Sequence, residues 1–469
     1  MVELERRRRR PPIWLAILAV GLLAVGGFYF AAPQVASISP AREAENVPRS
    51  AAVEITFNQP MDPESVNARL SVQPTVSGEV SWQGNTLRFA PDDGWPEGGD
   101  VTVRLEAGAR SAYRLPMLTA ERWTFSVAEP QVLYLTPPEG ATQLVAHPLG
   151  RAFGQPLLAP ELSISDYDVS ADNSSLVYLA RMPDGAESVH LLDLVSGESS
   201  AIHTCAPDIR CLQVVLSPDA RWIALEVQRS RETDTGVRQT TAHRVLVLPT
   251  QGAGEPTPLG PENSASRFPS WAADNRLGYY DAASSSVVVV ERASDGDWRD
   301  VASVPHPLGE RWTWSPDGRF IVFPEVELLD EPTADGVEFY SHLYRVEVET
   351  GLRTNLSGTP GDLVEDAAPS YSPDGLWIAF ARKLLRPSEW TPGRQLWIMR
   401  ADGTQAQPLT EAPNYNHAGV EWNRSGTRLT YVRFLQVKLD SPPEVWWLDL
   451  ESEERSMLIE GGYAPEWMP

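Results

Sequence analysis

Cysteine is nearly absent from this sequence, since Cys205 and Cys211 are the only two among 469 residues. Five residues separate them, and in an oxidising compartment such a pair can close a short loop. The alternative is two unrelated thiols, but their isolation within one connection favours a disulfide. A zinc site would need more ligands nearby than His203 alone. The sequence therefore predicts a disulfide and no metal site.

Catalytic motifs are also absent from the sequence. We find no G-x-S-x-G nucleophile elbow, no H-E-x-x-H pair, no Walker A loop and no dinucleotide fingerprint. The seven histidines are scattered along the chain, which is typical of ordinary loop and strand residues. We therefore expect no enzyme activity, no catalytic residues and no cofactor.

Positive charge is scarce outside the N-terminus. The chain has 39 lysines and arginines against 63 aspartates and glutamates, which gives a net charge of −24 at pH 7. A charge of this sign repels phosphate backbones and anionic lipid headgroups, so nucleic acid is excluded as a partner. The simplest explanation of the acidity is that it keeps a solvent-exposed domain soluble.

Charge of either sign is absent from residues 13–32, an apolar run that follows five consecutive arginines at 6–10. At 1.5 Å per residue the run reaches roughly 30 Å, the thickness of a bilayer core. The alternative is a cleaved signal peptide, whose apolar region is usually shorter. We favour a single-pass anchor at 13–32. The basic tail, 1–12, is then cytoplasmic and everything after the anchor is extracytoplasmic.

What the sequence does contain is a repeat. The stretch YSPDGLWIAF, which starts at Tyr371, returns as WSPDGRFIVF from Trp314 and LSPDARWIAL from Leu216. Worn copies start at Val169, Trp271 and Trp422. Pro fixes one turn dihedral, Asp can hydrogen-bond its own backbone, and Gly accepts positive φ, so each copy predicts a hairpin turn. The aspartates and the tryptophans at these positions are then turn formers and core residues, not site residues.

The spacing of the copies indicates the architecture. They recur at intervals of 47, 55, 43, 57 and 51 residues, and the strand after each turn is apolar on both faces. Four strands per period of this size predict the blades of an all-β propeller. The first blade lacks a first strand near Gln131, and 461–469 matches the missing segment. The C-terminal strand would therefore close a ring of seven blades, with six as the alternative count.

The repeats resemble a known family. WSPDG with its apolar strand, followed by QLWIMRADGTQAQPLT from Gln395, is similar to the TolB-type (WD40-like) β-propeller repeat. The resemblance implies a propeller over 129–469 and leaves its function open, because such propellers serve as binding platforms, as periplasmic Tol-Pal components and as enzyme caps.

A second unit lies between the anchor and the propeller. Short alternating runs, such as 53–57, 101–105 and 123–127, are separated by Pro, Gly and Asp clusters and predict a small β-sandwich over 34–128. The SP opening, the VP before VEITF, the PMD after it and the closing WTFSV resemble the bacterial Ig-like domain of the SbsA type. The resemblance carries no chemistry, and we favour a stalk that lifts the propeller off the membrane over an adhesive domain.

Two functions remain open at this stage. The first is a non-catalytic binding or scaffold module for a protein or a cell-envelope glycan. The alternative is a propeller enzyme whose acidic residues converge on the central channel to act on envelope glycans.

Long insertions point to one binding face. They fall between the second and third strands of four blades, at 228–243, 325–342, 383–394 and 434–443. Insertions gathered on one face commonly mark the binding side, although unconstrained drift would produce the same pattern. The candidate contacts are an acidic rim and an aromatic platform beside an arginine: Glu325, Glu327, Asp330, Glu331, Trp390 and Arg386.

Overall fold

The computed structural model describes residues 31–468 except for short gaps. The gaps are Asn46, Ser50, Asp93, Glu97, 172–173, 183–184, Val195, 233–237, Ala253, 334–335, 360–361 and Leu439. The predicted cytoplasmic tail and all but the last two residues of the predicted anchor lie outside the described residues. No helix in the described part is both long and apolar enough to cross a membrane.

The chain divides into two compact units, which end and begin at Glu129 and Pro130. The first unit is a sandwich of two antiparallel sheets and carries a short helix, α2 (Pro63–Asn67). One sheet has the order β1 (Val35–Ser39), β2 (Val53–Phe57), β5 (Thr86–Pro91), β4 (Gly78–Gln83). The other has the order β3 (Leu70–Gln73), β6 (Asp100–Leu105), β7 (Glu121–Ser126).

Alternation explains why these residues form a sandwich. In β2 the side chains of Val53, Ile55 and Phe57 are buried, while Glu54 between them is exposed. Successive strand residues point to opposite faces, so one apolar face of each sheet can cover the core. Trp95 fills the centre of that core and meets the Phe125 ring edge-on at a centroid distance of 5.5 Å. The predicted Ig-like runs are therefore strands.

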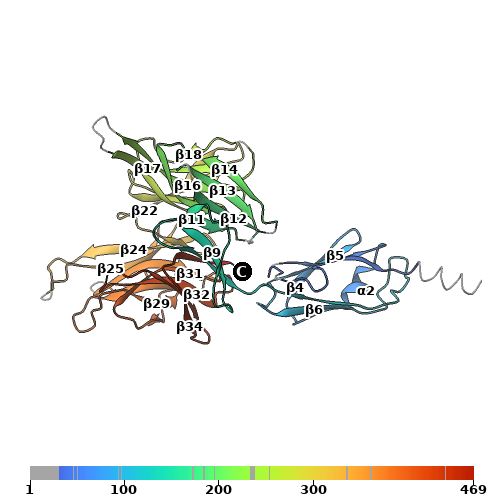
Figure 1. Ribbon diagram of the computed structural model, residues 1–469. Coiled ribbons are helices and arrows are strands. Elements are labelled where there is room, and N and C mark those ends of the chain that lie inside the picture. Colours follow the sequence, from blue (N-terminus) through green and yellow to red (C-terminus); the bar gives the residue numbers. More distant parts are fainter. Residues whose placement is uncertain are drawn as a thin grey trace, which may run out of the picture. The chain divides into compact units, whose positions relative to one another are not determined.

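The second unit is built from antiparallel sheets whose strands mostly follow chain order (Figure 1). Three of these sheets have four strands each: β11 (Ser163–Val169), β12 (Ser175–Arg181), β13 (Glu187–Asp193), β14 (Ser199–Thr204); β15 (Ile209–Leu216), β16 (Trp222–Glu232), β17 (Arg238–Pro249), β18 (Thr257–Pro258); and β19 (Ser266–Trp271), β20 (Leu277–Asp281), β21 (Ser286–Arg292), β22 (Trp298–Pro305).

The next two groups of strands are joined by one parallel pair, Ser341 with Glu365. They are β23 (Thr313–Trp314), β24 (Phe320–Leu328), β25 (Phe339–Glu347), β26 (Arg353–Asn355), and β27 (Val364–Tyr371), β28 (Trp377–Leu384), β29 (Gln395–Arg400), β30 (Gln407–Pro408). A further four-stranded sheet consists of β31 (Tyr415–Trp422), β32 (Arg428–Leu435), β33 (Glu444–Asp449) and β34 (Arg455–Glu460).

The remaining sheet combines both ends of this unit. Its order is β10 (Gln155–Pro156), β9 (Gln143–Pro148), β8 (Gln131–Thr136), β35 (Tyr463–Met468). β35 pairs antiparallel with β8 and places Trp467 opposite Val132. Figure 1 accordingly shows the C-terminus beside β9. The predicted pairing of the last strand with the N-terminal strands of the propeller is confirmed.

The Ser-Pro-Asp turns behave as their chemistry predicts. Ser315 Oγ donates to Asp317 Oδ1 at 2.5 Å, and the Gly318 amide donates to the Ser315 carbonyl at 2.8 Å. Gly318 has φ +68°, a conformation that costs glycine little. The turns at Ser217 and Ser372 have the same serine-to-aspartate hydrogen bond. The aspartates Asp219, Asp317 and Asp374 are thus turn formers, as predicted, whereas Asp172 lies outside the described residues.

The tryptophans at the end of the first strands join neighbouring sheets. Trp314 Nε1 donates to the Ser270 carbonyl of the preceding sheet at 3.2 Å, and Trp422 Nε1 donates to the Ser370 carbonyl at 3.0 Å. Trp271 makes the equivalent bond to the Val215 carbonyl at 3.2 Å. The prediction that these rings are core between sheets is confirmed. Their N–H groups also align successive first strands around a common axis.

Candidate functional site

Five first strands, β15, β19, β23, β27 and β31, surround one cavity of about 450 Å³. Its walls are Gln213 and Val215 of β15, together with 268–271, 311–314, 368–370 and 419–421. These are the last residues of each first strand before its Ser-Pro-Asp-type turn. A hollow shared by several sheets of a propeller is its axial channel, a common place for ligands.

The repeat determines which side chains face this channel. The residue just before the large apolar residue at each turn is, in sheet order, Asp168, Val215, Ser270, Thr313, Ser370, Glu421 and Glu466. The three carboxylates belong to β31, β35 and β11, which follow one another around the ring. Two residues earlier in the same strand, β11 contributes a fourth carboxylate, Asp166. Acidic side chains therefore gather along one side of the axis.

Three of the four carboxylates bind backbone amides of a neighbouring first strand. Asp168 Oδ2 accepts from the Leu216 amide at 2.6 Å, and Asp166 Oδ2 accepts from the Val214 amide at 2.8 Å. Glu466 Oε1 accepts from the Val169 amide at 3.2 Å. Two of the donating amides, those of Leu216 and Val169, belong to the residues that replace the aromatic residue before the turn. Asp166, Asp168 and Glu466 therefore help to hold the ring together.

Glu421 differs from the other three carboxylates. Its carboxylate has neither a hydrogen bond nor an ion pair with any residue that the structure describes, and its side chain is accessible to solvent. The side chain lines the axial cavity. The carboxylate is accessible to water, but the protein around it removes much of its hydration and raises the pKa of Glu421 to about 7. The positive charge of Arg311 partly opposes this shift. Glu421 is available to a ligand.

Repulsion adds to the effect of burial on the other carboxylates. Burial raises the pKa of Asp166 and of Asp168 to about 7 in each case, against the lowering effect of their backbone hydrogen bonds. Burial, followed by the charges of Asp168 and Glu421, raises the pKa of Glu466 well above its usual range. Asp166, Asp168 and Glu421 therefore take up and release protons near neutral pH. Among the described residues, no set of three His, Cys, Asp or Glu side chains has a geometry that could hold a metal ion.

The wall opposite these acids combines a cation with aromatic rings. Arg311 lies 5.1 Å from the centroid of the Phe268 ring, and its Nη2 is 3.5 Å from Gln213 Oε1. Phe268 has φ +53°, which is rare for a bulky residue, and the Glu226 carboxylate holds its amide at 2.8 Å. The equivalent residues Ala368 and Ala464 also have positive φ, so this conformation belongs to a bulge that recurs in the first strands. A guanidinium against an aromatic face shows that this wall accommodates a cation.

One donor in the cavity wall has no partner. Trp312 is 8% exposed, and its Nε1 finds no acceptor among the described residues. The neighbouring Trp314 and Trp271 instead donate to backbone carbonyls. A buried donor without an acceptor costs free energy, about 1–3 kcal/mol. A ligand that brings an acceptor would remove that cost.

The acidic rim expected from the sequence is partly occupied by internal contacts. Glu325 is ion-paired with Arg353, and Glu327 accepts hydrogen bonds from Tyr340 and Tyr344, each at 2.8 Å. The sequence offered no sign of these partners, since they are 13 to 28 residues away. Asp330 and Glu331 are exposed beyond the end of β24.

The aromatic platform and the arginine contact different partners. Trp390 is 53% exposed, and Lys383 Nζ lies 5.0 Å from the centroid of its ring. Arg386 lies 3.9 Å from the Asp362 carboxylate. Two of the four insertions prove to be extensions of hairpins: β16 and β17 pair as far as Glu232 with Arg238, and β24 and β25 as far as Leu328 with Phe339. Strand pairing therefore covers most of the described residues of 228–243 and the two ends of 325–342.

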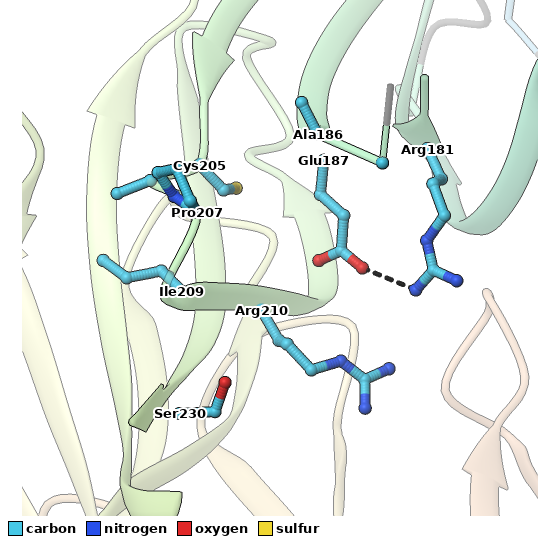
Figure 2. Close-up of a pocket in the computed structure, with 10 residues that line it drawn as sticks. Arg181, Ala186, Glu187, Cys205, Pro207, Ile209, Arg210 and Ser230 are labelled. Atoms are coloured by element: carbon cyan, nitrogen blue, oxygen red, sulfur yellow. Dashed lines mark hydrogen bonds and ion pairs between the residues drawn. The ribbon is translucent and has the colours of Figure 1, made fainter. Parts of the chain in front are cut away.

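A second cavity, of about 740 Å³, lies between the β12–β13 connection and the link from β14 to β15 (Figure 2). Arg181, Glu187 and Arg210 line it, together with several apolar residues. Arg181 Nη2 and Glu187 Oε1 form an ion pair at 2.8 Å. Nothing in the sequence marked this cavity, because its residues come from four separate segments.

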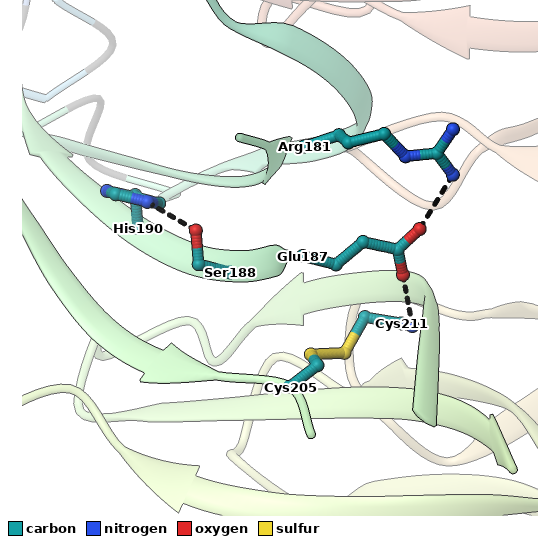
Figure 3. The surroundings of a disulfide bond; sticks show 6 residues. All are labelled: Arg181, Glu187, Ser188, His190, Cys205 and Cys211. Atoms are coloured by element: carbon teal, nitrogen blue, oxygen red, sulfur yellow. Dashed lines mark hydrogen bonds and ion pairs between the residues drawn. A yellow bond between two sulfur atoms is a disulfide. The ribbon is translucent and has the colours of Figure 1, made fainter. Parts of the chain in front are cut away.

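The two cysteines are joined by a disulfide in the wall of this second cavity (Figure 3). Both are buried, each 4% exposed. Glu187 links them to β13, because its carbonyl accepts from the Cys205 amide and its Oε2 accepts from the Cys211 amide, both at 2.8 Å. The disulfide therefore fixes the link between two sheets.

Comparison with known proteins supports the two-part architecture. A family model described as "Bacterial Ig-like domain" matches residues 31–127. An uncharacterized protein of Agrobacterium fabrum is 26% identical over 168 residues, which is 33% of this chain and 50% of the relative. The chain thus spans half the length of the curated relative that it matches.

Solved structures are similar to the chain in fold. TolB from Acinetobacter baumannii is 11% identical with a TM-score of 0.41, covering 93% of this chain and 99% of that one. A periplasmic gluconolactonase from Pseudomonas aeruginosa is 15% identical with a TM-score of 0.44, covering 72% of this chain and 99% of that one. An oligogalacturonate lyase in complex with manganese is 17% identical with a TM-score of 0.32, covering 71% and 73%. Residues 31–127 thus match a bacterial Ig-like domain, and the chain is similar in fold to TolB and to other β-propeller structures. Similarity at this level of identity concerns the fold and assigns no function.

Proposed function

We propose that the propeller is a binding module that takes a cationic side chain of a partner protein into its axial cavity. The observation that carries this proposal is the unpaired carboxylate of Glu421, which faces a cavity with aromatic walls. Carboxylates and aromatic faces both attract ammonium and guanidinium groups. A lysine or arginine side chain on a polypeptide would also bring backbone carbonyls, which could accept from Trp312 Nε1.

Charge strengthens the proposal. Glu421 lines the cavity together with one described cation, Arg311, and three further carboxylates, Asp166, Asp168 and Glu466, lie on the neighbouring first strands β11 and β35. A bound cation favours the ionised form of Glu421, so binding should release protons near pH 7 and strengthen as the pH rises through that value. The acidity of the whole chain, −24, would speed the approach of a basic partner.

Calorimetric titration with the peptide acetyl-Gly-Gly-Lys-Gly-Gly-amide tests the proposal. We expect this peptide to bind and its norleucine counterpart not to bind. Glu421→Gln should weaken binding about tenfold or more, since a hydrogen bond to a charged group contributes roughly 1.5–3 kcal/mol. Glu349→Gln, which removes the same charge from an exposed turn residue, is the matched control and should leave the affinity unchanged. Equal binding of the norleucine peptide, or equal weakening by both variants, would contradict the proposal.

A second candidate function is a propeller enzyme that cleaves an envelope glycan or an ester. The observation that favours it is the pKa of Glu421, about 7, which suits a general acid at neutral pH. Incubation with envelope glycans and model esters separates the two functions. Turnover that Glu421→Gln abolishes and Glu349→Gln preserves would replace the binding function with catalysis.

We further propose that the propeller has seven blades, closed by β35, and that residues 13–32 anchor the protein in the cell membrane with both units on the extracytoplasmic side. The uncharged run behind five arginines supports the anchor. Full-length protein should remain in the membrane pellet after carbonate extraction. A wholly soluble product whose N-terminus follows Ala32 would show that the segment is cleaved instead.

A further inference from the structure

The cavity beside the disulfide carries a positive charge that sets it apart from the rest of this acidic chain. Two arginines, Arg181 and Arg210, and one carboxylate, Glu187, line it. Figure 2 shows these three side chains projecting from separate segments into the same pocket. The lining therefore has a net charge of +1, whereas the whole chain carries −24. A local positive charge in such surroundings favours one anionic group.

Arg210 is the group free to bind that anion. The Glu187 carboxylate is already satisfied, because one oxygen meets Arg181 and the other accepts from the Cys211 amide (Figure 3). Arg210 is exposed and makes no ion pair or side-chain hydrogen bond with the described residues. A guanidinium presents five donors in a planar fork that matches a carboxylate. Arg181, 54% exposed, keeps further donors that point away from Glu187.

Apart from Ser230, the rest of the lining is apolar. Ala186 lies on one side of the pocket, and Pro207 and Ile209 lie on the other. A pocket of 740 Å³ is within the range that holds a small organic molecule. We infer that this pocket binds an organic anion with one carboxylate and a compact apolar body, the carboxylate on Arg210 and Arg181 and the body against Pro207 and Ile209.

The disulfide positions the arginine that this inference needs. Cys205, Ala206, Pro207, Ile209 and Arg210 line the pocket, and all of them lie in the ring that the Cys205–Cys211 bond closes. Within the ring, the Ile209 amide donates to the Ala206 carbonyl at 2.8 Å. A closed ring holds Arg210 in place before a ligand arrives, and this preorganisation lowers the entropy cost of binding. Arg210 is the binding residue, and the disulfide is a positioning element.

Titration calorimetry with acetyl-leucine tests the inference, because this probe has one carboxylate and one apolar side chain. The full-length protein should bind acetyl-leucine and should not bind acetyl-leucine amide, which lacks the charge. Arg210→Ala should lower the affinity at least tenfold, and Arg210→Lys should lower it less, since it keeps the charge but loses the fork. Arg299→Ala is the matched control: it removes an exposed arginine of β22, outside the pocket, and should leave the affinity unchanged.

Three results would overturn the inference: equal binding of acetyl-leucine and its amide, equal weakening by Arg210→Ala and Arg299→Ala, or no binding to the wild-type protein. Inorganic phosphate as a competitor tests the ligand class, and phosphate binding as tight as that of acetyl-leucine would overturn the carboxylate assignment. Thermal unfolding of Arg210→Ala should match the wild type, because Arg210 is exposed. This test is independent of the axial cavity, because the Arg210→Ala variant should still bind the lysine peptide with the affinity of the wild type.

Discussion

Trp467 Nε1 donates a hydrogen bond to the backbone carbonyl of Glu421 at 3.2 Å. This bond joins the last strand of the chain to the first strand of the sheet before it, and it fixes the backbone of the residue whose side chain lines the axial cavity. Ring closure and the candidate site thus depend on the same contact. A substitution of Trp467 should therefore change both the stability of the propeller and the position of Glu421.

Trp467→Phe should destabilise the propeller by about 1–2 kcal/mol, because it removes the hydrogen bond that the buried Trp467 side chain donates to the Glu421 carbonyl. The lower midpoint should be visible in urea unfolding followed by circular dichroism. Trp390→Phe is the matched control, since Trp390 is 53% exposed and should change stability by less than about 0.5 kcal/mol. Equal effects of the two substitutions would show that the Trp467 bond does not hold the ring.

Asp168→Asn should make the protein more stable at neutral pH. Asp168 has a pKa of about 7 in the folded chain and 3.8 as its ordinary value. Between these values the folded chain binds more protons than the unfolded chain, so stability falls as pH rises from about 4 to about 7. The amide cannot ionise, and its oxygen can still accept from the Leu216 amide. The gain in melting temperature over the wild type should be absent below pH 4 and largest above pH 7.

The same measurement on Glu349→Gln separates this local effect from the acidity of the chain as a whole. Glu349 is exposed, so its substitution should give a difference from the wild type that hardly changes with pH. A gain for Asp168→Asn that stays constant from pH 4 to pH 8 would show that Asp168 is not the titrating group.

Cys205 and Cys211 should both resist thiol labelling in unfolded, unreduced protein and should both react after reduction, because they form a disulfide. Replacing both by Ser should lower stability by about 2 kcal/mol, as expected for a short closed loop. The double variant should also bind acetyl-leucine more weakly, since the ring no longer holds Arg210. Labelling of both thiols before reduction would show that the bond is absent.

The sequence was informative wherever a local rule decides the structure. The Ser-Pro-Asp turns depend on residues within five positions of one another, so the hydrogen bond from Ser315 to Asp317 could be predicted from their spacing. The role of Trp314 as core followed from its repeat position, although its hydrogen bond to the Ser270 carbonyl did not. When the copies are aligned, Glu421 and Glu466 occupy the same repeat position. This pattern could have indicated a site at the axis, but neither residue was predicted as a site residue.

Other features depend on ring closure and could not be derived from local sequence. Glu466 binds the Val169 amide across 297 residues of chain, and only the pairing of β35 with β8 brings them together. The pKa of Glu421 depends on enclosure by several sheets, which no local pattern encodes. Conversely, the sequence predicts that Glu325 and Glu327 form an open acidic rim. In the structure their carboxylates bind cross-strand partners in β25 and β26.

Trp390 and Arg386 remain proposed contacts on the face of the long connections. Trp390 is 53% exposed, and Arg386 keeps most of its donors because its ion pair with Asp362 is long, at 3.9 Å. Exposed aromatic and arginine side chains are the residues that most often carry binding energy in protein interfaces. Replacing both by Ala should therefore weaken capture of the native partner about tenfold or more, as measured by surface plasmon resonance.

The same double substitution should hardly change the melting temperature, because neither side chain is buried and Trp390 contacts only the Lys383 ammonium among the described ring contacts. Leu352→Ala with Arg319→Ala is the matched control, since it removes an exposed apolar side chain and an exposed arginine at the opposite ends of the strands, beside a Ser-Pro-Asp turn. It should leave capture intact. Full capture after shortening of all four connections would show that the partner binds elsewhere, and Glu421→Gln would then test whether it binds at the axial cavity.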